Sequence, residues 1–347
     1  MKPISIIQIG LGSWGQNWIR DVLAHQRAVD VVAYVDRDAG RLDAARRRFD
    51  LPKGRCFRSL HHAFQSVDAE AVLVTTTMGT HVPVIEASLA AGKHVLTEKP
   101  FAACLKDAHE MVALAEERGR VLMVSQNYRW FPAVRAVQDL LAQGRLGAVQ
   151  GVSLDFRKPP GRDPRQGPSR VLVDMGIHHL DLLRAVLRLD LAEVTAMCVD
   201  RDWRAWSGEP GASLPLAIFA LLRYGESVPV SYRFSWLSHD VPTTWGGDWS
   251  IECAAGQIRW TSRGDDGAAQ DDVIVRRAGE AAEMVRLPEL AHTGRSGCLH
   301  AFVEAIITGC EPETSGRDNL KTLEAMDALV AAVAPVAPGT PVELGAC

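Results

Sequence analysis

The feature that most constrains the fold is a glycine-rich turn close to the N terminus. A short β-branched run, Ile4 to Ile9, leads directly into Gly10-Leu11-Gly12-Ser13-Trp14-Gly15 and then into a helical pattern. Gly10 permits a tight turn, Gly12 lets the main chain approach a pyrophosphate, and Gly15 lets helix and strand pack closely. This order predicts a Rossmann-type dinucleotide site, with the pyrophosphate on the helix N terminus.

An acidic residue at the end of the next strand bears on the choice of cofactor. Asp36 closes the candidate strand Val31 to Asp36, where its carboxylate can accept bonds from both adenosine ribose hydroxyls and would repel a 2′-phosphate. This favours NAD, although Arg37 could pair with the 2′-phosphate of NADP. The cofactor contacts expected in this segment are Gly10, Leu11, Gly12, Ser13, Trp14, Gly15, Asp36 and Arg37.

Short strands alternate with amphipathic stretches through the rest of the first 125 residues. Further strands are predicted at Ala71 to Thr75, His94 to Thr97 and Val121 to Val124, with helices that include Leu42 to Phe49 and Lys106 to Glu117. Such alternation implies right-handed crossovers and a parallel sheet covered on both faces. Residues 1–125 are therefore predicted to form a doubly wound, NAD-binding α/β domain.

Strand signals dominate the remainder, residues 126–347. The expected elements are a helix over Asp174 to Leu189, a strand of alternating apolar residues from Val228 to Trp236, a hairpin of Trp249 to Cys253 with Gln257 to Trp260, and closing helices over Leu299 to Ile307 and Asn319 to Val333. We expect an α+β substrate-binding domain on a large, mostly antiparallel open sheet, with the closing helices packed back on the first domain. The aromatic residues at alternate positions of the 228–236 strand suggest an apolar sheet face buried in a homodimer or homotetramer.

Composition excludes several classes of protein. The net charge of −4 gives no basic surface for nucleic acid, and no apolar run approaches the roughly 20 residues that cross a bilayer. The seven cysteines are scattered singly, without metal-ligand spacing, and the opening segment lacks a signal-peptide pattern. We therefore expect a cytoplasmic protein without a metal site, acting on a small molecule.

Two further motifs carry a family resemblance. Residues 94–100 read HVLTEKP, and residues 174–181 read DMGIHHLD. Together with the glycine turn, the segment from Asn127 to Val149 and the closing stretch from Thr314 to Leu329, they resemble the Gfo/Idh/MocA oxidoreductase family. The resemblance covers essentially the whole chain. It implies a Rossmann domain followed by an open mixed sheet, with the active site between them.

The resemblance also implies catalytic roles. Lys99 matches the lysine of the Glu-Lys-Pro motif and would hold the substrate hydroxyl, whereas a bare sequence reading would make it a solvated loop lysine. Asp174 and His178, four residues apart, share one helix face, where the imidazole could accept the hydroxyl proton. The alternatives are a helix N-cap for Asp174 and a hydrogen-bonded core residue for His178. Asp181, on the same face, either contacts substrate or anchors the helix, and His179 is read as structural.

Additional contacts carry over by position. Thr75, Thr76 and His81 match the cofactor-binding loop after the third main strand, Glu98 and Lys99 match the Glu-Lys-Pro turn, and Asn127 matches a polar position near the nicotinamide. The chain departs from the family at Met78-Gly79, where a Pro-Asn-like pair is common.

A basic loop raises the question of an anionic substrate. Arg157, Lys158, Arg162, Arg165 and Arg170 are crowded together, and Arg157 is a candidate substrate contact, although a solvated loop is the simpler interpretation. Several tryptophans, including Trp203, Trp206 and Trp245, could stack on a sugar but are more often core residues. The expected activity is an NAD-dependent oxidation of a CH–OH group of a sugar, sugar acid or cyclitol-like molecule. Alternatives are a glycoside hydrolase that uses NAD transiently and a non-catalytic NAD-binding sensor or scaffold.

Overall fold

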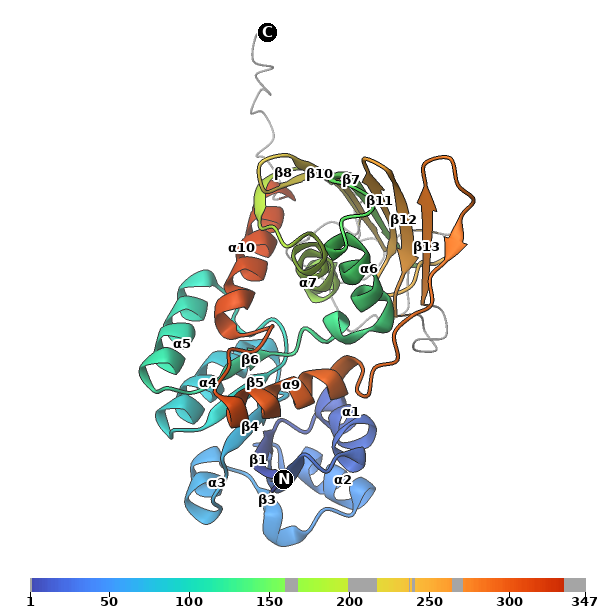
Figure 1. The fold of residues 1–347 in the computed structure, drawn as a ribbon. Helices are drawn as coiled ribbons and strands as arrows, with labels where there is room; N and C mark the ends of the chain where they lie inside the picture. The colour runs from blue at the N-terminus through green and yellow to red at the C-terminus, as the bar shows by residue number, and fades with distance from the viewer. Residues whose placement is uncertain are drawn as a thin grey trace, which may run out of the picture.

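The computed structural model describes residues 2–159, 168–198, 217–236, 238, 241–263 and 271–333, and for residues 168–171 it describes the backbone alone. Two domains are stacked along the long axis of the molecule, with helices α9 and α10 running between them (Figure 1). None of the helices in these ranges is both long and apolar enough to span a membrane.

The N-terminal domain contains a six-stranded parallel sheet in the order β3-β2-β1-β4-β5-β6. Its strands are β1 (Ile4–Ile9), β2 (Val29–Val35), β3 (Cys56–Phe57), β4 (Ala71–Val74), β5 (His94–Thr97) and β6 (Leu122–Val124). The flanking helices are α1 (Ser13–Asp21), α2 (Ala39–Phe49), α3 (Leu60–Ser66), α4 (His81–Ala90) and α5 (Leu105–Glu117). The predicted doubly wound fold is confirmed; only β3 was not foreseen, because two residues are too few to show a period.

The second domain is built on an eight-stranded sheet in the order β14-β13-β12-β11-β7-β10-β9-β8. Its strands are β7 (Val149–Arg157), β8 (Leu191–Cys198), β9 (Ala217–Tyr224), β10 (Val228–Ser235), β11 (Asp248–Cys253), β12 (Gly256–Thr261), β13 (Asp272–Arg277) and β14 (Glu283–Met284). All neighbouring strands are antiparallel except β7 and β10. The expected large, mostly antiparallel sheet is confirmed, including the β11–β12 hairpin.

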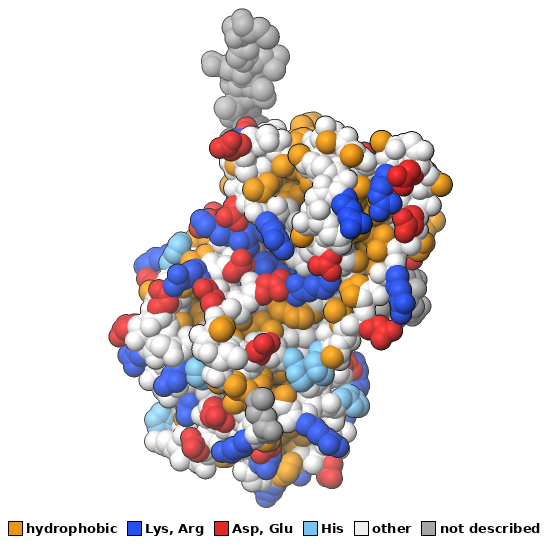
Figure 2. All heavy atoms as spheres, in the orientation of Figure 1, with side chains coloured by type: hydrophobic (Ala, Val, Ile, Leu, Met, Phe, Trp, Pro, Cys, Tyr) orange, Lys and Arg blue, Asp and Glu red, His pale blue; other side chains and the backbone are white. Residues whose placement is uncertain are grey.

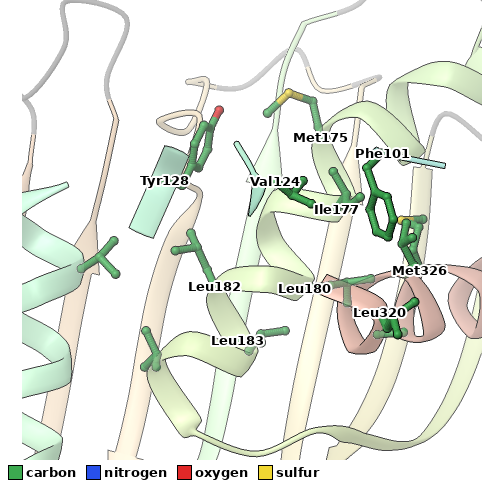
Figure 3. Close-up of a cluster of buried hydrophobic side chains, with 14 of the residues drawn as sticks. Phe101, Val124, Tyr128, Met175, Ile177, Leu180, Leu182, Leu183, Leu320 and Met326 are labelled. Atoms are coloured by element: carbon green, nitrogen blue, oxygen red, sulfur yellow. The ribbon is translucent and has the colours of Figure 1, made fainter. Parts of the chain in front are cut away.

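Helices cover one face of this sheet. They are α6 (Pro132–Ala142), α7 (Pro168–Leu187) and α10 (Gly316–Val333) (Figure 1). Close up, α7 presents Leu180, Leu182 and Leu183 to the core, and Leu320 and Met326 of α10 lie in the same cluster (Figure 3). Helix α7 begins six residues before the predicted start at Asp174, so the N-cap alternative for Asp174 is wrong.

The alternating strand β10 turns its aromatic residues inward, contrary to expectation. Val230, Tyr232 and Phe234 are all about 1% exposed and belong to the core. The intervening Ser231 and Arg233 face outward. The apolar part of the outer face lies instead at the β8–β9 edge, where Met197, Phe219 and Leu221 are 75%, 50% and 68% exposed. Period-two alternation reveals that a strand has two unlike faces, but the face that meets the helices is decided by packing.

The two closing helices tie the domains together. Helix α9 (Gly294–Thr308) contributes Cys298, Leu299 and Phe302 to the core cluster of β1 and α1. Helix α10 packs against α5 and β6 of the first domain and against α7 and β8 of the second. The junction between the domains is therefore a packed interface that fixes the edge of the parallel sheet relative to α7.

Candidate active site

The glycine turn has the geometry that its spacing predicts. Gly10 has a φ of +96°, and a Cβ there would lie 2.7 Å from the amide nitrogen of Thr76. A Cβ on Gly15 would collide with the carbonyl oxygen of Gly10. A Cβ on Gly12, by contrast, would meet no protein atom within 4 Å, and α1 has no side-chain cap. An open backbone beside free N–H groups is what a pyrophosphate requires, so the residues present fit a dinucleotide.

Asp36 lies at the end of β2, under the glycine turn. Its side chain is 6% exposed; Oδ2 accepts the Leu11 N–H at 2.8 Å and Oδ1 accepts the Asp38 N–H at 2.9 Å. Each carboxylate oxygen keeps a lone pair for a further donor. Arg37 is exposed. The acid is thus fixed by the main chain, whereas the neighbouring cation is on the surface.

The loop after β4 supports both the glycine turn and the Glu-Lys-Pro turn after β5. Thr75 Oγ1 donates to the Gly10 carbonyl at 2.7 Å, and Thr76 Oγ1 is buried without a hydrogen-bond partner. The ring nitrogens of His81 lie 2.8 Å from the Pro100 carbonyl oxygen and 3.0 Å from that of Thr76. Burial lowers the pKa of His81. Predicted as a cofactor contact, His81 instead joins two loops, while Thr76 keeps a free hydroxyl.

Glu98 connects the Glu-Lys-Pro turn to the glycine-turn helix. Its Oε1 accepts the indole N–H of Trp18 at 2.6 Å, and the carboxylate is 5% exposed. Trp14, on the same helix, is 39% exposed, and the guanidinium carbon of Arg295 lies 4.7 Å from its ring centroid. These contacts hold the start of α1, the end of β5 and the start of α9 together. Lys99 is thereby placed beside the dinucleotide turn.

Lys99 and Asp174 meet across the domain junction. The ammonium group donates to Asp174 Oδ1 at 2.5 Å and to the Asp174 carbonyl oxygen at 2.9 Å. The Lys99 side chain is 10% exposed and that of Asp174 is 42% exposed. An ammonium has three N–H groups, so one remains for a substrate oxygen. Lys99 is therefore not a solvated loop lysine.

His178 lies one turn further along α7. Its ring stacks on Tyr128 with centroids 4.0 Å apart, and Nδ1 is buried without a partner. Tyr128 belongs to the short 3-10 helix η4 (Asn127–Trp130), and burial raises its pKa to about 12. Burial, together with the positive charges of Lys99 and Arg263, holds the pKa of His178 well below its usual value. The imidazole is consequently neutral at physiological pH, able to take up a proton.

The two remaining polar residues of the motif have structural partners. The ring nitrogens of His179 lie 2.8 Å from the Tyr232 hydroxyl and 3.1 Å from the Trp245 carbonyl oxygen. Asp181 is 1% exposed and accepts two N–H groups of Arg129, at 2.6 and 2.8 Å. Of the two roles left open for Asp181, these contacts favour anchoring of α7. The expected substrate contact at Asp181 is therefore not supported, because its carboxylate is buried and occupied by Arg129.

Arg157 lies on the wrong side of the sheet for a substrate contact. Its guanidinium pairs with Asp155 at 3.0 Å and Asp248 at 3.4 Å, on the outer face. The next residue, Lys158, points to the covered face, 5% exposed, with its ammonium 4.2 Å from the Trp245 ring centroid. Arg162, Arg165, Trp203 and Trp206 lie outside the described residues, as does the side chain of Arg170. Asn127, predicted near the nicotinamide, is buried beside Gly294 of α9.

Three residues at the site had no individual signal in the sequence. They are Tyr128, against which His178 packs; Arg263, whose guanidinium carbon lies 5.2 Å from the Tyr128 ring centroid; and Arg295, over Trp14. Across the described parts of the chain, no group of three or more His, Cys, Asp or Glu side chains is arranged to hold a metal ion. Acidic and basic side chains are interspersed on the molecular face shown in Figure 2.

Comparison with known proteins gives a family match in both domains. The family described as "Oxidoreductase family, NAD-binding Rossmann fold" matches residues 4–126, and the "GFO/IDH/MocA C-terminal domain" matches residues 134–267. D-apiose dehydrogenase of Paraburkholderia graminis is 29% identical over 336 residues, which cover 91% of this chain and 84% of that protein. 1,5-Anhydro-D-fructose reductase of Ensifer adhaerens is 37% identical over 151 residues, 42% of this chain and 45% of that protein.

Solved structures share the fold over nearly the full length. The aldose–aldose oxidoreductase of Caulobacter crescentus, crystallised with glycerol, superposes with a TM-score of 0.81 at 22% identity and covers 95% of this chain and 97% of that one. At this identity the likeness concerns the fold alone.

Proposed function

Because the chain belongs to the Gfo/Idh/MocA oxidoreductase family, we propose that it is an NAD-dependent dehydrogenase that oxidises a secondary alcohol of a sugar, sugar acid or cyclitol-like molecule. The observation that carries this proposal is the meeting of Lys99 with Asp174 across the domain junction, next to a neutral His178. An oxygen-binding cation beside a proton acceptor is the pair of groups that alcohol oxidation needs.

In the proposed reaction Lys99 holds the substrate oxygen. The N–H group left over by Asp174 donates to the hydroxyl, and the ammonium charge stabilises the negative charge that develops on that oxygen. Asp174 keeps the ammonium in position through its carboxylate and its carbonyl oxygen. His178 accepts the hydroxyl proton. Since Nδ1 is buried, we assign this step to Nε2.

The cofactor site is formed by the glycine turn and its surroundings. Gly12 and the first N–H groups of α1 would hold the pyrophosphate, Asp36 the adenosine ribose, and Thr76 and Asn127 would contribute polar groups nearer the nicotinamide. When bound, the nicotinamide supplies the hydride acceptor for the oxidation. The buried Asp36 and the exposed Arg37 together support NAD over NADP.

The substrate class rests on the site and the relatives together. D-apiose dehydrogenase, a relative that matches across most of the chain, carries a sugar substrate in its name. A polyhydroxylated substrate also suits a site whose reactive side chains are all hydrogen-bonding groups.

We further propose a homo-oligomer, a dimer or tetramer, formed through the outer sheet face with its exposed Met197, Phe219 and Leu221.

A substrate screen tests the proposal. The full chain is incubated with sugars, sugar acids and cyclitols and with NAD or NADP, and the absorbance of the reduced nicotinamide is followed. We expect net NAD reduction with at least one polyol and its loss in Lys99→Met. Cleavage of a glycoside without net reduction would instead indicate the transient-oxidation hydrolase, and NAD binding without any turnover would indicate a sensor.

A further inference from the structure

Arg263 is a cation beside the active site, and among the described residues the Asp271 carboxylate attracts it electrostatically without forming an ion pair with it. It follows β12, and its guanidinium carbon lies 5.2 Å from the centroid of the Tyr128 ring that stacks on His178. Across the part of the chain that the structure describes, its side chain makes neither a hydrogen bond nor an ion pair. The adjacent Asp271 accepts the main-chain N–H of Arg263, at 2.7 Å.

The backbone at Arg263 argues that the side chain is held there for a purpose. Its φ of +59° lies in the left-handed region, which a side chain with a Cβ adopts at a cost. The main chain is nevertheless fixed by two hydrogen bonds. The Trp245 N–H donates to the Arg263 carbonyl oxygen at 2.9 Å, and the Gly246 N–H donates to the Ser262 carbonyl oxygen at 2.9 Å. Strained backbone that the surroundings hold in place is common where a side chain must be aimed at a ligand.

The charge balance of the site indicates the kind of ligand. Lys99 is matched by Asp174, so the ammonium charge is largely compensated before substrate binds. Arg263 adds a second positive charge near His178, because its charge, after burial and Lys99, helps to lower the pKa of that histidine. His178 is therefore under the influence of two positive charges, and within the described ranges only that of Lys99 is held in an ion pair. A guanidinium with its fork of donors unused matches a planar oxyanion, which it can bind through two parallel hydrogen bonds.

We propose that Arg263 binds a carboxylate of the substrate, so that this dehydrogenase acts on sugar acids. This inference rests on the proposed function and narrows it: the reacting hydroxyl lies at Lys99 and His178, and the carboxylate lies at Arg263. The basic residue that recognises the anion comes from the β12 end and not from the predicted Arg157, which is engaged by Asp155 and Asp248.

The test compares acids with uncharged analogues of the same shape. D-Gluconate, D-galactonate, D-glucuronate and D-galacturonate are each paired with the corresponding amide, and glucose 6-phosphate is the phosphate arm. Binding to the NAD-loaded full chain is measured by calorimetry, and turnover is measured separately. The variants are Arg263→Gln and Arg263→Lys, with Arg259→Gln as the matched control because Arg259 is an exposed arginine on β12, the strand that Arg263 follows.

In the wild type we expect at least one acid to bind ten to about a hundred times more tightly than its amide, as charge-assisted hydrogen bonds typically provide. Arg263→Gln should abolish that preference and leave amide binding within about threefold. In Arg263→Lys, which keeps the charge but not the forked donor geometry, the preference for the acid should lie between those of wild type and Arg263→Gln. Arg259→Gln should behave as wild type. Circular dichroism spectra identify any variant that fails to fold.

Several results would overturn the inference: no acid bound, equal binding of acid and amide, equal loss of both in Arg263→Gln, or a preference for the sugar phosphate. Failure of the dehydrogenase proposal is a separate outcome. Arg263-dependent binding of an acid without NAD reduction would refute the dehydrogenase and leave the carboxylate site intact. Oxidation of neutral polyols alone would support the dehydrogenase and refute the carboxylate site.

Discussion

The ammonium nitrogen of Lys99 lies 2.5 Å from a carboxylate oxygen of Asp174 and 2.9 Å from the carbonyl oxygen of the same residue. Lys99 follows a strand of the parallel sheet and Asp174 lies in the second turn of α7, so one ion pair spans the two domains. Because the Lys99 side chain is 10% exposed, this contact is protected from water more than a surface pair would be. It aligns the two parts of the proposed catalytic centre.

Removal of either partner should impair catalysis more than cofactor binding. Lys99→Met deletes the oxygen-binding cation, and Asp174→Asn keeps the shape but loses the charge that positions it. We expect kcat to fall by about a hundredfold or more in Lys99→Met and by less in Asp174→Asn. NAD affinity, measured by calorimetry, should stay within about threefold of wild type, since neither side chain belongs to the adenosine end. Undiminished turnover in folded Lys99→Met would exclude the proposed role.

The glycine turn allows a paired test of the dinucleotide site. Gly12→Ala should fold normally and lose NAD affinity by at least about tenfold, because the added methyl group meets no protein atom but occupies the space needed for the pyrophosphate. Gly15→Ala should lower the melting temperature, because its Cβ collides with the Gly10 carbonyl. Gly54→Ala, also without a neighbour within 4 Å, is the control. Unchanged NAD affinity in Gly12→Ala would place the cofactor elsewhere.

Cofactor preference should depend on Asp36. In the wild type we expect NAD to bind at least about tenfold more tightly than NADP, since a 2′-phosphate would face a fixed, 6% exposed carboxylate. Asp36→Asn removes the charge and keeps an oxygen acceptor for the Leu11 or Asp38 amide, so the preference should narrow. Arg37→Ala should leave NAD binding unchanged. Calorimetric titration with both cofactors decides, and tighter NADP binding by the wild type would show that Arg37 dominates.

Local sequence patterns foretold those parts of the site that are local in the chain. The glycine turn is a six-residue pattern, and Asp174 and His178 share a helix face by their spacing alone, so both could be predicted. Asp181 could not be resolved, because its partner Arg129 lies 52 residues away and comes close only when η4 packs on α7.

The basic loop shows a different limit. Arg157 ends β7 and Lys158 follows it directly, yet successive residues of extended chain point to opposite faces of a sheet. Of these two neighbours, Arg157 therefore lies on the outer face and Lys158 in the core. Arg263 carried no signal, because a single arginine after a strand has no periodicity. Only the tertiary packing that places it over Tyr128 distinguishes it from the other arginines.

Buried histidines should make stability depend on pH on the acid side. Burial lowers the pKa of His179 to about 4, and that of His81 and His178 is also lowered. In the unfolded chain each titrates at about pH 6.5, so below this value the unfolded state binds more protons and the free energy of unfolding falls. Asp271, whose pKa burial raises to about 6, acts in the opposite direction.

The contribution of His179 can be isolated by comparing variants. The free energy of unfolding in urea is measured for wild type and His179→Gln at pH 7 and at pH 5. Its change between the two pH values should differ, because the glutamine cannot take up a proton. The contribution of Asp271 is the same in both proteins and cancels in the comparison. We expect the wild type to lose about 2 kcal/mol more than the variant between these pH values. Parallel pH dependences would mean that His179 titrates normally and is not held neutral by the core.

The outer face of the large sheet should mediate self-association. Met197 lies opposite Phe219 in the β8–β9 register, and Leu221 is on the same face, so three largely exposed apolar side chains adjoin one another. A two-fold, sheet-to-sheet contact would remove them from water in both copies at once.

Light scattering behind a sizing column should give a multiple of 37.8 kDa for the wild type. The double substitution Phe219→Lys and Leu221→Lys should shift the mass toward 37.8 kDa without a loss of melting temperature beyond that explained by dissociation. Ile307→Lys, at a 45% exposed position on α9, is the control and should leave the assembly intact. A wild-type mass of 37.8 kDa would exclude the assembly, and an unchanged oligomer in the double variant would move the interface to another face.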